Sequence, residues 1–130
     1  MKHFDWQLRM EAFLKTRQNM SFAWGRNDCA TFAADCVLAL AGKDHGVGLR
    51  GHTTALQAAR TLKRHGGLVA IATADLGAPI PSAFAQIGDV VLSKAGDQDM
   101  LAICNGSTAL APGPDGLVTV AMGNYCWRVE

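Results

Sequence analysis

The feature that most constrains the fold is the apolar segment 29–40, which contains one charged residue, Asp35. The side chains of Asn27 and Asp28 can accept hydrogen bonds from free backbone N–H groups, and Gly42 can end a helix. The pattern therefore predicts a helix that begins directly after Asp28. Small residues along this segment would let another element pack closely against it: Ala30, Ala33, Ala34 and Ala39. A helix of this composition belongs in the centre of a domain.

Helical periodicity also occurs on both sides of this segment. Apolar residues recur at helical spacing between about residues 4 and 18, which predicts an amphipathic first helix. A glycine-rich loop over 42–51 is followed by Thr53 and Thr54, either of which can cap a third helix. A shorter helix is expected over 68–76. The inner face of the third helix is expected to consist of Leu56, Ala59 and Leu62.

Beyond residue 86 the apolar pattern changes from helical to extended. Short apolar runs separated by Gly, Pro, Asn and Asp predict strands at 90–92, 100–104, 117–121 and 125–129. The segment 112–116, Pro-Gly-Pro-Asp-Gly, is expected to be a turn or loop. Helices followed by strands predict an α+β domain in which a small antiparallel sheet packs on the central helix. With 130 residues, 49% of them hydrophobic, the chain is expected to form one domain over 1–130.

Charge and hydropathy argue against two classes of partner. The sequence has 12 Lys and Arg against 11 Asp and Glu, so it lacks the basic excess that neutralises a row of phosphates, and no nucleic-acid partner is expected. Apolar runs such as 68–72 are far too short to span a bilayer, and the N-terminal segment has no apolar signal-peptide run. We therefore expect no membrane span and synthesis in the cytoplasm.

The four cysteines show neither a CxxC pair nor a zinc-type spacing with histidine, so no metal and no cofactor is expected. If Cys29 and Cys36 share a helix, their Cα atoms are roughly 10 Å apart, which is beyond disulfide reach. Cys104 and Cys126 lie in apolar, strand-like contexts and are expected to be buried hydrophobic residues.

Cys29 is the candidate nucleophile because of its position. It follows a predicted N-cap at the positive end of a buried helix, where the dipole and the free N–H groups favour a thiolate. Catalytic cysteines are commonly activated in this way. The alternative is that Cys29 only fills space at the start of the helix.

Three segments of the sequence together carry a resemblance to a known family. They are Phe-Ala-Trp-Gly-Arg-Asn-Asp-Cys-Ala-Thr-Phe at 22–32, Gly-Asp-Val-Val at 88–91 and Leu-Ala-Ile-Cys-Asn-Gly at 101–106. This combination resembles the NlpC-type cell-wall cysteine peptidases, and more closely a small family of phage and prophage proteins related to them. The resemblance extends over most of the chain. It implies a papain-like fold in which Cys29 opens the central helix and faces the sheet.

The resemblance also implies a chemistry that this sequence does not complete. Active members cut peptidoglycan stem peptides with a thiolate, a histidine at the start of the second strand, and a third polar group on the next strand. The position that matches the histidine is Met100, whose thioether cannot accept and return a proton. The position of the third group falls near 109–111, where no residue is polar. The resemblance thus points to a phage tail-tip component, or a component of a phage-derived particle, that is catalytically impaired.

For this first hypothesis the expected partners are phage tail hub or baseplate proteins and peptidoglycan, and the expected location is the virion tail after synthesis in a bacterial cytoplasm. A second hypothesis is an active peptidoglycan-cleaving endopeptidase in which Cys29 works with a non-standard base. His52 is the preferred base because its loop can fold back over the helix start, and Asp99 is the candidate if the strand register slips by one residue. A third hypothesis is a thiol or redox sensor.

Two more residues are candidates for a substrate groove. Trp24 can present an aromatic face to a sugar or a peptide, although a tryptophan in a domain of this size is more often a core or interface anchor. Asp28 is next to the candidate nucleophile, but its simpler role is to cap the helix. Asp35 is expected to pair with Arg26, Arg50 or a backbone group.

Overall fold

The computed structural model describes all 130 residues and has the α+β organisation that the sequence predicts. Four helices come first, and one six-stranded antiparallel sheet follows in the order β1-β6-β2-β3-β4-β5. The helices are α1 (Trp6–Arg17), α2 (Cys29–Ala41), α3 (Ala55–Arg64) and α4 (Leu68–Leu76). The strands are β1 (Ile80–Pro81), β2 (Val90–Ala95), β3 (Gln98–Cys104), β4 (Ala109–Gly113), β5 (Gly116–Val120) and β6 (Tyr125–Trp127), with a 3-10 turn η1 (Ser82–Phe84) after β1.

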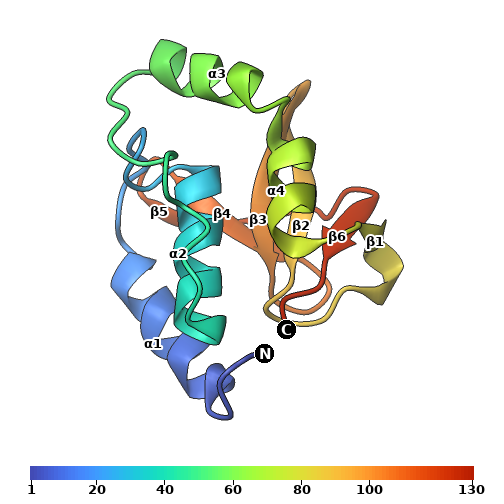
Figure 1. Cartoon of the computed structure of the whole chain (residues 1–130). Coiled ribbons are helices and arrows are strands. Elements are labelled where there is room, and N and C mark those ends of the chain that lie inside the picture. The colour runs from blue at the N-terminus through green and yellow to red at the C-terminus, as the bar shows by residue number, and fades with distance from the viewer.

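Helix α2 is central, as its composition predicts. It lies between α1 and the sheet, where it packs against β3 (Figure 1). Its start is fixed by a capping box, in which the Asp28 carboxylate accepts from the backbone N–H of Thr31 at 2.9 Å and the Thr31 hydroxyl accepts from the backbone N–H of Asp28 at 3.0 Å. Its end is at Gly42, which has φ +75° and donates its N–H to Leu38. The predicted signals for this helix are therefore confirmed at both ends.

The hydrophobic side chains form two clusters on opposite faces of the sheet. The first cluster lies between the helices and the sheet and includes Phe32, Trp127, and Leu101 and Ile103 from β3. The second cluster lies on the other face and includes Ala102. Because side chains alternate along a strand, β3 contributes to both clusters in turn. This alternation decides which residues of β3 can face α2.

Two details of the sequence prediction are wrong. Leu56 and Ala59 are exposed on α3, whereas Ala58 and Thr61 are buried. The segment 112–116 is not all loop, because Pro112 and Gly113 belong to β4 and pair with Leu117 and Gly116 of β5. A proline has no N–H to donate to a neighbouring strand. Strand β3 pairs with β4 only at Ala109 and Leu110, so no residue of β3 lies opposite Pro112 and no hydrogen bond between the two strands is lost there.

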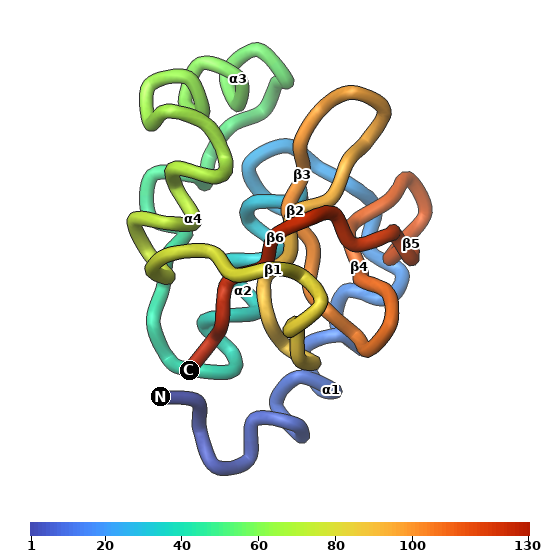
Figure 2. The backbone as a smooth tube through the Cα atoms, turned by 90° about the vertical axis from the view of Figure 1, so that its right-hand side faces the viewer, coloured from blue at the N-terminus to red at the C-terminus, as the bar shows by residue number.

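The ends of the chain lie close together in both views (Figure 1 and Figure 2). The backbone N–H of His3 donates to Leu40 at the end of α2, at 2.8 Å. Asp89 holds the other end, because its fully buried carboxylate accepts from Val129 N–H at 3.1 Å and from Arg128 Nε at 3.2 Å. The same carboxylate accepts from Gln86 N–H at 2.9 Å.

No helix has the length and apolar character needed to cross a membrane.

Replacing Asp89 with alanine should destabilise the fold strongly. The change leaves two backbone N–H groups and the Arg128 guanidinium without their acceptor, and we expect the free energy of unfolding to fall by about 3 kcal/mol. Urea denaturation followed by circular dichroism measures this loss. Asp97→Ala in the exposed turn between β2 and β3 is the control, and its stability should stay within about 0.5 kcal/mol of the wild type. Equal stability of the two variants would contradict the role given to Asp89.

Candidate active site

Cys29 is the first residue of α2 and is half-buried. Its side chain packs against the first hydrophobic cluster, and the thiol lies against the backbone of Leu101 on β3. The capping box of Asp28 sets this position, because it fixes where α2 begins. The candidate nucleophile therefore stands at the start of the central helix and faces the sheet.

A small cavity of about 40 Å³ adjoins Cys29, and we call it the Cys29 cavity. Four of the residues that the sequence singles out contribute to it: Trp24, Asp28, Cys29 and His52. The remaining lining residues come from α2, the loop before α3, α3 itself and the start of α4: Ala30, Leu49, Ala58, Thr61, Leu62 and Leu68. The loop that carries His52 thus does fold over the start of α2.

The position of His52 is set by direct backbone packing on the turn before Cys29. The N–H of Gly51 donates to the carbonyl of Gly25 at 3.2 Å. Gly25 has φ +69°, and a Cβ built on it would lie 2.3 Å from the backbone nitrogen of His52. Only glycine meets both conditions, because other residues are strained at this φ and would also clash. This glycine is what brings the two segments together.

Thr61 is a residue of the site that the sequence analysis does not identify. Its hydroxyl lies 3.0 Å from Nε2 of His52, and the side chain is only 5% exposed. This contact leaves Nδ1 of His52 as the ring nitrogen available to another partner. The sequence signal for Thr61 is a polar residue on the inner side of a helix. This signal is not sufficient, because the sequence pattern does not place the loop that carries its partner, His52.

The carboxylate of Asp28 is fully used by the fold. One oxygen accepts from Gly25 N–H at 2.8 Å, and the other accepts from the N–H and the hydroxyl of Thr31, at 2.9 and 3.0 Å. The residue is 6% exposed. Asp28 borders the cavity, but its carboxylate has the capping role and not the role of a substrate ligand. Trp24 is 40% exposed and stacks edge-on against Phe22, with ring centroids 4.7 Å apart.

The structure does not bring the other two candidates to Cys29. Asp99 pairs with Lys94 at 3.2 Å on the exposed end of the β2–β3 hairpin. Met100 packs against the second hydrophobic cluster, on the face of the sheet that is turned away from α2. Neither residue lines the Cys29 cavity. Strand β3 therefore presents Leu101 to this region, and no proton-transfer group.

Burial raises the pKa of the Cys29 thiol, and the negative charge of Asp28 raises it further. Hydrogen bonding by the backbone of Leu101 and Ala30 lowers the pKa, but by less. The expectation of a thiolate favoured by the helix start is therefore wrong. A helix terminus stabilises a charge by only about 0.3–1 kcal/mol, whereas transfer of a charge into apolar surroundings costs several times more.

The size of the Cys29 cavity also limits its chemistry. A volume of about 40 Å³ can hold water, because one water molecule needs roughly 10–15 Å³ of such space. Pockets that hold small molecules are typically about 300–1,000 Å³. The Cys29 cavity is therefore much smaller than a typical small-molecule site.

The remaining cysteines are buried in the hydrophobic clusters. Cys104 and Cys126 are fully buried in β3 and β6, as the sequence predicts. Burial raises the pKa of Cys36 to about 12, so this thiol is inert at neutral pH. No group of three or more His, Cys, Asp or Glu side chains lies close enough to hold a metal ion.

Asp35 has a structural role. It forms ion pairs with Arg17 of α1 and with Arg50 of the loop after α2. The pairing with Arg50 is one of the predicted alternatives, whereas the pairing with Arg17 is not. Arg17 also donates to the buried amide of Asn27 at 3.0 Å, so it connects α1 to the segment that begins α2.

Comparison with protein families gives one match. A family model described as a domain of unknown function, DUF6950, matches residues 1–129, and the chain belongs to this family. No curated protein and no solved structure matches the chain.

Alkylation of Cys29 should require a higher pH than alkylation of a free thiol. Because burial raises the pKa, the thiol stays protonated through neutral pH, and the reactive thiolate forms only as the pH rises above the range of an ordinary cysteine. Iodoacetamide labelling of Cys29 as a function of pH, read by peptide mass spectrometry with N-acetylcysteine as the reference, measures this. A rate inflection below that of N-acetylcysteine would show that the helix start dominates after all.

Proposed function

We propose that the chain is a phage tail-tip component, or a component of a phage-derived particle, built on an NlpC-type cell-wall cysteine peptidase scaffold whose hydrolytic chemistry is impaired. The observation that carries the loss of chemistry is the environment of Cys29. Its pKa is raised by burial, and the cavity beside it measures only about 40 Å³. A thiol in this state is protonated at neutral pH and is a poor nucleophile.

The architecture is consistent with a papain-like scaffold. A cysteine opens the central helix, that helix packs on an antiparallel sheet, and the cysteine faces the second of two consecutive long strands, β3. The three sequence segments that resemble the NlpC-type peptidases form the turn before α2 with its first turn, the start of β2, and the end of β3 with the turn after it. The phage assignment rests on the sequence resemblance alone.

Acyl transfer needs more than a sulfur atom. A base must take the thiol proton, and an acid must return a proton to the leaving amine. A histidine on the strand beside the helix performs both steps in active members of the resembled family. Here β3 offers Leu101 on that face, and Met100 is turned to the other. The protein would therefore act as a structural or wall-recognising part of the particle.

A second candidate function, a cysteine peptidase with a non-standard base, is favoured by one observation. His52 borders the same cavity as Cys29, and the Thr61 hydroxyl holds its Nε2. A histidine held at one ring nitrogen can serve as a base through the other. Catalysis would then require more space beside Cys29 than the cavity of about 40 Å³ provides. The redox-sensor hypothesis loses support, because sensor thiols have a low pKa and are accessible to solvent.

Digestion of purified bacterial sacculi distinguishes the two functions. We expect the wild-type protein and Cys29→Ala to release the same background amount of soluble peptide, because the thiol is protonated and β3 offers it no proton-transfer group. Release by the wild type that Cys29→Ala abolishes, and that His52→Ala and Thr61→Val both reduce, would establish the peptidase instead. If Cys29→Ala lowers the release of soluble peptide but His52→Ala does not, the base is a residue other than His52.

The particle location has a separate test. Phage or phage-derived particles produced from a genome that encodes the chain should carry it at the tail tip, where immunogold electron microscopy with an antibody to the chain would detect it. Particles from a genome with the coding sequence deleted are the control. Absence of the chain from purified wild-type particles would contradict the proposal, whatever the result with sacculi.

A further inference from the structure

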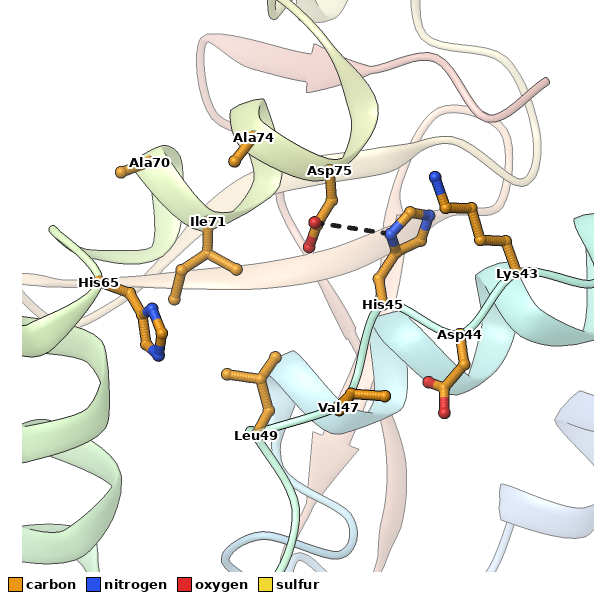
Figure 3. Close-up of a pocket in the computed structure, with 10 residues that line it drawn as sticks. All are labelled: Lys43, Asp44, His45, Val47, Leu49, His65, Ala70, Ile71, Ala74 and Asp75. Atoms are coloured by element: carbon orange, nitrogen blue, oxygen red, sulfur yellow. Dashed lines mark ion pairs between the residues drawn. The ribbon is translucent and has the colours of Figure 1, made fainter.

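Leu49, in the loop between α2 and α3, lines three cavities at once. One is the Cys29 cavity of about 40 Å³. The second, which we call the α4 cavity, measures about 320 Å³ and lies between this loop and α4 (Figure 3). The third, which we call the seam cavity, measures about 30 Å³ and lies between α2 and α4. No residue other than Leu49 lines both the Cys29 cavity and the α4 cavity.

The seam cavity adjoins both of the others. It shares Ala30 and Leu49 with the Cys29 cavity. It shares four residues with the α4 cavity: His45, Leu49, Ile71 and Asp75. Its wall on α2 includes three of the small residues that the sequence places along this helix: Ala30, Ala33 and Ala34. The three cavities therefore follow one another from the start of α2 to α4, with Leu49 at their common boundary.

The walls that α3 and α4 give to the Cys29 cavity have no comparable space behind them. Ala58, Thr61 and Leu68 are buried, and Leu62 packs against the first hydrophobic cluster. Displacing any of them would disturb close packing, which is costly. Behind Leu49, by contrast, lies the much larger α4 cavity, where Figure 3 shows the Leu49 side chain directed toward α4. A larger group at the sulfur therefore gains room most readily where Leu49 now lies.

The backbone around Leu49 allows this side chain to move. Gly48 has φ +88° and Gly51 has φ +90°, and a Cβ built on either would meet nothing within 4 Å. Small loop residues of this kind commonly absorb the φ and ψ changes of a hinge. The backbone N–H of Leu49 donates to the carbonyl of Gly46 at 2.9 Å, within the same loop. Leu49 can therefore leave its place without breaking a hydrogen bond of a helix or a strand.

We infer that Leu49 sets the size of the molecule that can occupy the site at Cys29. With Leu49 in place, the sulfur adjoins a space of about 40 Å³. With Leu49 displaced, the Cys29 cavity, the seam cavity and the α4 cavity form one groove. Leu49 is thus a specificity-determining residue and has no catalytic role. The inference does not rest on the proposed function, because it holds for any molecule that approaches the thiol, whether or not Cys29 cleaves a bond.

Two maleimides of different size test the inference, because both add to the thiolate through the same ring. N-ethylmaleimide is the small reagent and N-pyrenylmaleimide is the bulky one. Mass spectrometry of the Cys29 peptide measures each labelling rate on the folded chain, in which the other three cysteines are buried. The ratio of the bulky to the small rate cancels any change in the thiolate fraction. In Leu49→Ala we expect this ratio to rise about tenfold, because the bulky group then has room.

Leu62→Ala is the matched control, since it removes the same atoms from another wall of the Cys29 cavity. Its ratio should stay within about twofold of the wild type, and so should that of Val47→Ala, which changes only the α4 cavity.

A double variant tests whether the added room lies in the α4 cavity. Ala74 is exposed and lines that cavity alone, so Ala74→Phe in the Leu49→Ala background should return the ratio toward the wild-type value. Thermal unfolding followed by circular dichroism shows that each variant is folded. Leu49→Phe, which keeps a large side chain at the boundary, should not raise the ratio. The inference is overturned if Leu49→Ala leaves the ratio unchanged, if Leu62→Ala raises it equally, or if Ala74→Phe does not reverse the gain.

Discussion

The carboxylate of Asp28 is the interaction on which the rest of the arrangement around Cys29 depends. One oxygen fixes the first turn of α2 through Thr31, and the other fixes the preceding turn through the N–H of Gly25. Cys29 lies between these two anchors, and the Gly25 turn is the surface on which the His52 loop rests. A single buried side chain thus determines both where the candidate nucleophile stands and what closes over it.

The chemistry at Cys29 is decided by the competition between two effects of the same position. The start of a helix favours negative charge, but the start of a helix buried under a loop and a sheet also removes water. Here the loss of water outweighs the effect of the helix start, and the pKa of Cys29 is raised as a result. Cysteine peptidases resolve this competition with a charged histidine next to the sulfur. Where no such group contacts the sulfur, burial keeps the thiol protonated and unreactive. This is the basis of the proposed structural role.

The parts of the fold that depend on local signals could be predicted from the sequence. Helix α2 is an example, since both of its ends are set by neighbouring residues, Asp28 and Gly42. The inner face of α3 could not be predicted in the same way. Leu56 is the more hydrophobic residue, but the side that becomes buried is the one carrying Thr61, because that side meets the His52 loop. The sequence could suggest that His52 meets the Cys29 cavity but could not establish it, since the meeting depends on a glycine contact between segments more than 25 residues apart.

The proximity of the two ends of the chain has a mechanical consequence. Residues near both ends line one shallow hollow, from Lys2 and His3 on one side to Arg128 and Val129 on the other. Tension applied through both ends would enter and leave the molecule at this one place, and it would act first on the His3 and Asp89 hydrogen bonds. Because Leu40, Trp127 and Val129 all belong to the cluster between the helices and the sheet, a pull on the chain ends would load that packing directly.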